Sequence, residues 1–372
     1  MARRLAAVVL GTAILCGVAV GAELRFLGSY EIKTGEWWFG TMPVGEISGL
    51  AYNPDLDIYY GICDNRGKDP EEGVAGRLYL LDIDLGRCGI YGVKVVSVVF
   101  LDSDPEAPGV QPYGPGEVDA EEVLLTPDRR LIVSSERDLE NVPWIRVFAL
   151  DGVMLSEIPV PAAFIPAEGR GVRRNLALEA MALSPDGKTL FFANEQALVQ
   201  DGPIATPENG TQVRIVRYDL SGDAPREVAE YVYITEPIFA PPKGKYADNG
   251  VVAMLYVKHL VPEYDLFVVE RAYSSGVGND IKVFGVRLAG ADDVKDVEAL
   301  PYPFPGAAVE KTLLLRISAI PEYSDIPVVP DNIESIALGP VLPTGNPSLI
   351  MASDNNYNPH QRNLFLLFEL LP

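Results

Sequence analysis

A short strand motif recurs along this chain and constrains the fold more than any other feature of the sequence. The motif begins with an acid, continues through apolar or small residues and ends at a proline, as in EEVLLTP from Glu121, EAMALSP from Glu179 and ESIALGP from Glu334. A fourth copy, SGLAYNP, has Ser48 in the leading place. A second apolar strand, a few polar residues and a third strand follow each copy. Such units, repeated through most of a chain, predict a radial arrangement of antiparallel sheets.

The number of repeats predicts the number of sheets. A fifth unit, residues 251–288, keeps the strands but lacks the leading acid. We therefore predict an all-β fold, a single β-propeller with five to six blades of antiparallel strands. A sixth blade would have to lie in residues 90–118 or 289–330. We expect residues 23–32 to close the ring by joining the last blade, so that 23–372 forms one domain.

The N-terminal residues 1–22 have the pattern of a signal peptide. Arg3 and Arg4 precede an apolar run, and Ala22 fits the small-residue rule for cleavage. We expect cleavage after Ala22 and an exported protein, either periplasmic or secreted, with an uncleaved membrane anchor as the alternative. Cys63 and Cys88 would remain, and we do not expect a disulfide between them because antiparallel pairing places them at opposite ends of their strands.

The charge balance limits the class of partner. The chain has 52 acidic and 30 basic residues, and its formal net charge is −22. An acidic surface repels nucleic acid and anionic membranes, so we expect neither as a partner. Cations suit such a surface better. We expect a monomer that acts on a small molecule.

The propeller geometry predicts where the recurring acids lie. The inner strands of a propeller all run in one direction, so equivalent residues form a ring around one mouth of the channel. The leading acids are the candidate catalytic residues: Glu121, Glu179 and Glu334. The second strands end at the same mouth, and their terminal acids are candidate metal ligands: Asp64, Glu136, Glu195, Glu270 and Asp354. Ca²⁺ is the expected cation because it takes six to eight oxygen ligands, and the chain has only two histidines for a zinc or iron site.

Basic and amide side chains flank these strand ends. The candidate substrate-binding residues are Arg66, Arg137, Arg271 and Asn355. A guanidinium group matches the geometry of a phosphate. The carboxylates have a second interpretation, in which they accept hydrogen bonds from backbone N–H groups of the neighbouring blade and only stabilise the blade interface.

The chain resembles the phytase-like family, whose members are described as having the esterase-like activity of phytase. The resemblance extends from about Gly45 to Glu369. It lies in the following segments: Ser48-Gly49-Leu50, Asp119-x-Glu121, Asn175 to Leu183, Asn194-Glu195, Val269-Glu270-Arg271, Asn332-Ile333-Glu334 and Ser353-Asp354-Asn355-Asn356. It implies a propeller, an exported protein and an activity on phosphate or other esters. Glu122, Ala180 and Ser335 depart from the family pattern, because a glycine is usual at these places.

Three functions are compatible with these features. The first is an exported, calcium-dependent hydrolase of phosphomonoesters or related esters. The second is a propeller that binds a ligand or protein at the channel mouth without catalysis, which the absence of a nucleophile motif such as G-x-S-x-G favours. The third is a lactonase-like propeller with one central Ca²⁺ held by Glu and Asn oxygens.

Overall fold

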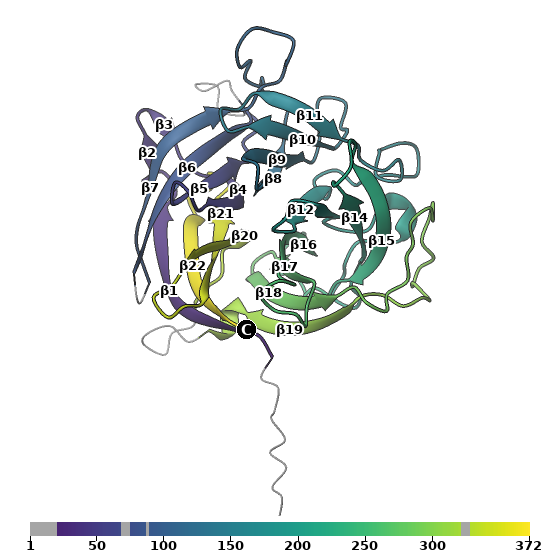
Figure 1. Ribbon diagram of the computed structural model, residues 1–372. Coiled ribbons are helices and arrows are strands. Elements are labelled where there is room, and N and C mark those ends of the chain that lie inside the picture. The colour runs from purple at the N-terminus through teal and green to yellow at the C-terminus, as the bar shows by residue number, and fades with distance from the viewer. Residues whose placement is uncertain (1–20, 68–74, 87–88, 321–327) are drawn as a thin grey trace, which may run out of the picture.

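The chain folds into a β-propeller with five blades. The computed structural model describes residues 21–67, 75–86, 89–320 and 328–372. Five four-stranded antiparallel sheets surround a central axis, with the first strand of each repeat innermost (Figure 1). No α-helix occurs in these ranges. The predicted all-β propeller is therefore confirmed.

Each blade contains consecutive strands, ordered from the axis outward. The first blade consists of β4 (Ile47–Asn53), β5 (Ile58–Cys63), β6 (Arg77–Gly86) and β7 (Gly89–Phe100). The second consists of β8 (Ala120–Leu125), β9 (Arg130–Ser135), β10 (Trp144–Ala149) and β11 (Met154–Ile158). The third consists of β12 (Leu178–Leu183), β13 (Thr189–Asn194), β14 (Gln212–Asp219) and β15 (Arg226–Ile234). The fourth consists of β16 (Ala247–Tyr256), β17 (Leu266–Ser274), β18 (Gly278–Arg287) and β19 (Glu310–Arg316). The fifth consists of β20 (Asn332–Val341), β21 (Pro347–Asp354), β22 (Arg362–Leu371) and β1 (Glu23–Lys33). A small hairpin, β2 (Trp38–Phe39) with β3 (Met42–Pro43), and two short 3₁₀ helices, η1 (Val199–Asp201) and η2 (Ile317–Ala319), complete the described elements.

The N-terminal strand closes the ring as predicted. β1 pairs antiparallel with β22, from Glu23 opposite Leu371 to Lys33 opposite Arg362. The last blade thus takes its outer strand from residues near the start of the chain, which ties the two ends of the domain together. The segments suggested for a sixth blade supply outer strands instead, β7 of the first blade and β19 of the fourth.

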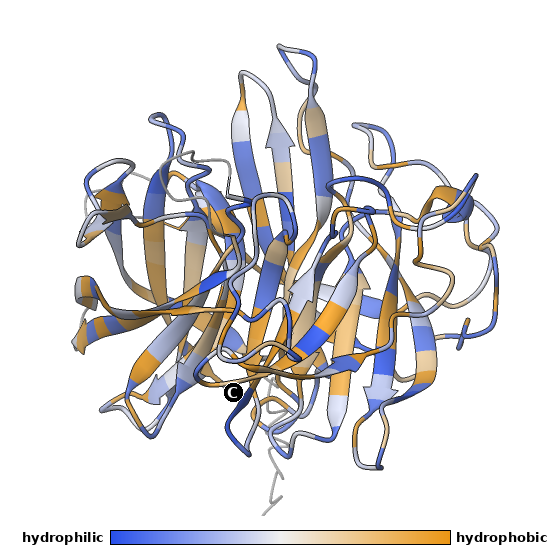
Figure 2. Cartoon of the chain, turned by 90° about the horizontal axis from the view of Figure 1, so that it is seen from above, coloured by the Kyte–Doolittle hydropathy of each residue, from blue (hydrophilic) through white to orange (hydrophobic). Residues whose placement is uncertain are grey.

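The hydrophobic core lies between neighbouring blades. Five buried clusters fill the five interfaces. Alternate residues of a strand point to opposite faces of its sheet, so Leu131 and Val133 pack toward the first blade while Ile132 packs toward the third. Both faces of each sheet are therefore apolar, which explains the nearly continuous apolar strands of the sequence. In the side view, hydrophobic strand segments occupy the middle of the molecule and hydrophilic residues are common in the end loops (Figure 2).

Proline-containing turns connect the first two strands in three blades. Thr126 Oγ1 donates a hydrogen bond of 2.6 Å to Asp128, and Ser184 Oγ donates one of 2.6 Å to Asp186. These side chains close the turns locally. In the fifth blade, β20 continues through Pro340 to Val341, so the strand does not turn at Pro340.

The predicted signal peptide and the two cysteines are only partly within the described ranges. Residues 1–20 and Cys88 lie outside the described residues. Cys63 is a buried free thiol whose Sγ donates to the carbonyl oxygen of Gly45 at 3.4 Å. Within the described ranges, no helix has the length and apolar character needed to cross a membrane.

Candidate functional site

A β-bulge at the start of every inner strand explains why these buried strands begin with carboxylates. The register shifts at the leading residue in all five blades, so that residue has no direct partner on the next strand. Glu179 and Glu334 are such bulged residues, and Glu121 lies in the bulge of the second blade together with Glu122. A bulge re-aims a side chain that would otherwise follow the strict alternation of the strand. All three leading acids consequently line one cavity at the channel mouth.

A second ring of residues follows directly after the strand pairing ends. The residues opposite the position before each bulge are Cys63, Ser135, Asn194, Glu270 and Ser353. The next residue in each blade lines the cavity: Asp64, Glu136, Glu195, Arg271 and Asp354. The fourth blade therefore places a cation where the other four place a carboxylate.

Glu270 does not belong to this ring, contrary to its position in the sequence pattern. It lies one residue before Arg271, and successive side chains of a strand point to opposite faces. Its carboxylate accepts hydrogen bonds from Tyr233 Oη at 2.6 Å and Glu236 N at 2.9 Å, and it pairs with Lys311 Nζ at 2.7 Å. These contacts stabilise the interface between the third and fourth blades, which is the second interpretation that the sequence allowed for such acids.

Asn355 and Arg66 also do not line the cavity. Asn355 Oδ1 accepts from Glu46 N at 2.9 Å, and its Nδ2 donates to Thr34 Oγ1 at 3.0 Å. Arg66 lies behind the rim, where it donates to Asp119 at 2.8 Å and to the Gly116 carbonyl at 3.0 Å. This arrangement does not favour the direct ligand contacts that the sequence positions of Asn355 and Arg66 suggested.

The remaining predicted residues meet in one acidic cavity of about 290 Å³. Its carboxyl groups come from all five blades or the segments that precede them: Asp64, Asp119, Glu121, Glu136, Glu179, Glu195, Asp248, Glu334 and Asp354. Two guanidinium groups, those of Arg137 and Arg271, line the same space. We call this space the acid cavity.

Both arginines of the acid cavity already contact carboxylates. Arg137 pairs with Asp119 at 2.7 Å and donates to Asn175 Oδ1. Arg271 pairs with Glu195 at 3.0 Å and with Glu334. Nε of each arginine is buried and has no hydrogen-bond partner among the described residues, so each guanidinium keeps one unused donor.

The cavity holds its carboxyl groups away from water, and their pKa values rise accordingly. Burial is the largest cause for Glu121, Glu179 and Glu195, and the charge of neighbouring carboxylates adds to it. Burial raises the pKa of Glu136 to about 8, although the Ala177 N–H donates to Oε1 of Glu136 at 2.7 Å and opposes the shift. A hydrogen bond between Glu136 and Glu179 raises the pKa of Glu179 and lowers that of Glu136, so Glu179 is the member that holds a shared proton.

Oxygen atoms suitable for a hard cation converge on this cavity. One carboxylate oxygen from each of Asp119, Glu121 and Glu136 lies within 4.8 Å of the others. Asp64 Oδ1 and Asp248 Oδ1 are buried and lack a hydrogen-bond partner in the described part of the chain. A donor set of carboxylate oxygens with orphaned acceptors fits Ca²⁺, which prefers oxygen ligands in a flexible arrangement.

The sequence patterns missed several residues of the cavity. Asp248 is the most important, because it supplies the carboxylate that the fourth blade lacks at its bulge, where Val252 stands. Its signal was present in the segment Ala247 to Gly250, just before the apolar strand. Tyr246 donates to Asp248 Oδ2 at 2.5 Å and lies beside Tyr273, with ring centroids 6.1 Å apart.

Asn332 is a further cavity residue, which the sequence indicated only as part of a family segment. Its side chain donates to Glu334 at 3.0 Å and to Asp354 at 3.2 Å. It therefore links the leading acid of the fifth blade to the acid that follows the second strand of that blade.

One sequence relative of this chain is an uncharacterized secreted protein from Arthroderma benhamiae. The two share 25% identity over 184 residues, which is 43% of this chain and 35% of that protein. The chain thus matches about a third of the length of this relative.

Two solved structures cover nearly the whole chain at low similarity. One, from Thermus thermophilus, is described as a "putative oxidoreductase (glucose dehydrogenase)"; it has 12% identity, a TM-score of 0.39, and coverage of 92% of this chain and 99% of that one. The other is a periplasmic gluconolactonase from Pseudomonas aeruginosa, with 13% identity, a TM-score of 0.39, and coverage of 95% and 99%. Because both TM-scores are low, these likenesses do not bear on the function of this chain.

A family model gives the decisive match. The model described as "Phytase-like: Esterase-like activity of phytase" matches residues 42–357, a range that contains every inner strand and every residue of the acid cavity. The chain therefore belongs to the phytase-like family.

Proposed function

We propose that the protein is an exported, calcium-dependent hydrolase of phosphate or related esters, and that the acid cavity is its active site. The observation that carries this proposal is the excess of carboxyl groups: nine line the cavity, against two guanidinium groups that are already paired. A buried excess of negative charge must protonate or bind a cation. Membership in the phytase-like family supports the choice of esters as the substrate class.

The carboxylates would divide into ligands and a proton donor. Asp119, Glu121 and Glu136 would hold the cation, together with Asp64 and Asp248, whose buried oxygens lack partners among the described residues. When bound, calcium supplies positive charge that attracts an anionic substrate and polarises its ester oxygens. Glu195 and Asp354 would complete the rim as further oxygen donors.

Glu179 would act as the general acid–base residue. It lines the acid cavity with the other leading acids, and its raised pKa lets it keep a proton at neutral pH. A carboxyl group in this state can donate a proton to a leaving oxygen. Arg137 and Arg271 would position an anionic oxygen of the substrate through the Nε donors that the described residues leave unused.

An activity panel tests this proposal. The purified protein is assayed against phosphomonoesters, carboxylic esters and lactones, with added Ca²⁺ and with chelator. We expect hydrolysis of a phosphomonoester or carboxylic ester that requires Ca²⁺ and that Glu179→Gln reduces by about 10²-fold or more. The matched control Glu208→Gln, in an exposed loop of the third blade, should retain full activity.

The outcomes separate the three functions. Calcium-dependent cleavage of lactones alone would replace the proposal with the lactonase-like alternative. No turnover of any class, in a folded protein that binds calcium, would favour a propeller that binds a ligand without catalysis.

The location and the oligomeric state form part of the same proposal. The relative from Arthroderma benhamiae is named a secreted protein, which supports export. We propose a monomer in the periplasm or outside the cell, and N-terminal sequencing together with light scattering of the purified protein would test both points.

A further inference from the structure

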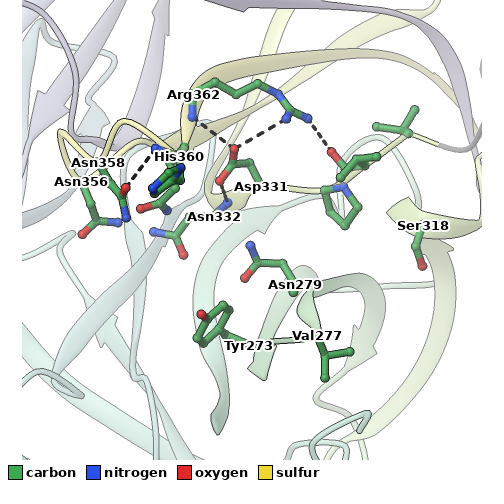
Figure 3. Close-up of a pocket in the computed structure, with 15 residues that line it drawn as sticks. Tyr273, Val277, Asn279, Ser318, Asp331, Asn332, Asn356, Asn358, His360 and Arg362 are labelled. Atoms are coloured by element: carbon green, nitrogen blue, oxygen red, sulfur yellow. Dashed lines mark hydrogen bonds and ion pairs between the residues drawn. The ribbon is translucent and has the colours of Figure 1, made fainter. Parts of the chain in front are cut away.

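A second hollow lies beside the acid cavity, at the boundary between the fourth and fifth blades. Its volume is about 860 Å³, and it shares three lining residues with the acid cavity: Tyr273, Asn332 and Asn356. Figure 3 shows side chains from both blades around this space. We call it the side groove. Because the two spaces share part of their walls, one molecule can occupy both.

The side groove differs from the acid cavity in its charge. Arg362 and Asp331 are oppositely charged neighbours in its wall, with Nη1 of Arg362 3.9 Å from the Asp331 carboxylate and the Arg362 backbone N–H donating to it at 3.2 Å. The guanidinium also contacts Glu31 at 3.0 Å and the Val329 carbonyl at 2.7 Å. The positive charge is therefore engaged within the protein, and a phosphate in the groove would face Asp331 instead.

The rest of the wall is polar and mostly uncharged. Carboxamide groups come from Asn279, Asn356, Asn358 and Gln361, and the ring of Tyr273 lies at the junction with the acid cavity. A carboxamide both donates and accepts hydrogen bonds, as a hydroxyl group does. Asn279 Oδ1 is buried and has no hydrogen-bond partner within the described ranges, so it is an acceptor prepared for a ligand donor.

We propose that the side groove binds an uncharged polyhydroxyl chain, a neutral oligosaccharide, which forms the non-reacting part of the substrate. The carboxamides would bind its hydroxyl groups, and Tyr273 would pack against the apolar face of a sugar ring. The volume lies within the range of pockets that enclose drug-sized ligands, which is larger than one small polyol requires. This inference rests on the proposed function only in placing the ester of that substrate in the acid cavity.

Binding of oligosaccharides tests the groove directly. Neutral gluco-, xylo- and manno-oligosaccharides and the polyanion inositol hexakisphosphate are titrated into the purified protein by calorimetry. We expect at least one neutral series to bind at concentrations below about 10 mM. Asn279→Leu and Gln361→Leu should each weaken that binding by about tenfold, the loss expected for one or two hydrogen bonds.

A matched variant and a folding control accompany these titrations. Asn209→Leu changes an exposed asparagine in a loop of the third blade, outside the groove, and should bind the same oligosaccharide as tightly as the unmodified protein. Thermal unfolding establishes that each variant folds. Absence of binding by all three neutral series, or unchanged affinity in both folded groove variants, would overturn the inference.

The two proposals fail in different ways. Oligosaccharide binding without hydrolysis of any ester would retain the side groove and refute the proposed function. Hydrolysis of small esters without oligosaccharide binding would retain the proposed function and refute the groove. Tight binding of inositol hexakisphosphate that Asn279→Leu abolishes would show that the groove takes a polyanion, contrary to the inference.

Discussion

Replacement of Arg271 by methionine removes the cation that the fourth blade contributes to the rim. In the folded protein this guanidinium contacts Glu195 at 3.0 Å, Asn332 Oδ1 at 2.9 Å and Glu334. Its side chain is 12% exposed and that of Glu195 is 1% exposed, so water cannot replace the lost partner. Methionine retains the unbranched apolar stem, and the change is therefore mainly one of charge.

The expected loss of stability depends on pH. Removal of one partner from a buried ion pair costs about 3–5 kcal/mol, because the other charge remains buried and uncompensated. We expect a loss of this size at pH 8 in chelator. At pH 5 the loss should be smaller, since burial raises the pKa values of Glu195 and Glu334 and a neutral carboxyl group needs no cation.

Urea unfolding at both pH values measures this difference. The control Arg129→Met removes an ion pair with Asp55 at the surface and should cost little at either pH. A loss for Arg271→Met that equals the control at pH 8, or that is the same at pH 5 and pH 8, would refute the electrostatic reasoning.

Three further changes test separate parts of the account. The raised pKa of Glu136, about 8 in the folded state, means that the folded protein binds more protons than the unfolded chain between about pH 4.5 and 8, so its stability in chelator should fall as pH rises through this window, by no more than about 5 kcal/mol. Urea midpoints should show this decline, and Glu136→Gln should flatten it; a rise in stability over the window would contradict the assignment. Glu270→Gln should lower the free energy of unfolding by about 1–3 kcal/mol through its lost contacts while calcium affinity stays unchanged, and a fall in calcium affinity would return Glu270 to the site. Gly250→Ala would press its Cβ against Glu195 Cγ and should cost about 1–3 kcal/mol by urea unfolding, whereas Gly92→Ala, with open space around its Cβ, should be tolerated.

The repeat motif was sufficient to predict the fold and much of the site. The recurrence of Glu121, Glu179 and Glu334 at one place in three repeats predicted a shared channel mouth, and the register confirms that these residues occupy equivalent bulges. The closing strand was also predictable, because residues 23–32 have the composition of a strand and precede the first repeat.

The fourth blade shows where the pattern failed. Its repeat has Glu and Arg side by side, and only the register decides which of the two faces the cavity, since a shift of one residue moves a side chain to the other face. The observed pairing of Val251 with Glu270 selects Arg271. Because this repeat has no leading acid, its motif did not direct attention to the earlier Asp248.

Ion pairs across blades were the other feature that the sequence could not supply. Arg66 and Arg137 both contact Asp119, although 53 residues separate Arg66 from Asp119 along the chain. The strand motifs place each arginine at the rim but do not determine the direction of its side chain. Their engagement with carboxylates, rather than with open space, follows only from the arrangement in three dimensions.

Calorimetric titration of calcium into the purified protein tests the central claim most directly. Cation binding to carboxyl groups with raised pKa values releases protons, so the measured heat should vary with the ionisation enthalpy of the buffer at pH 7. The account predicts saturable binding with proton release, and Glu121→Gln should weaken both. Absence of binding, or binding without proton release, would contradict the assignment of the acid cavity as a metal site.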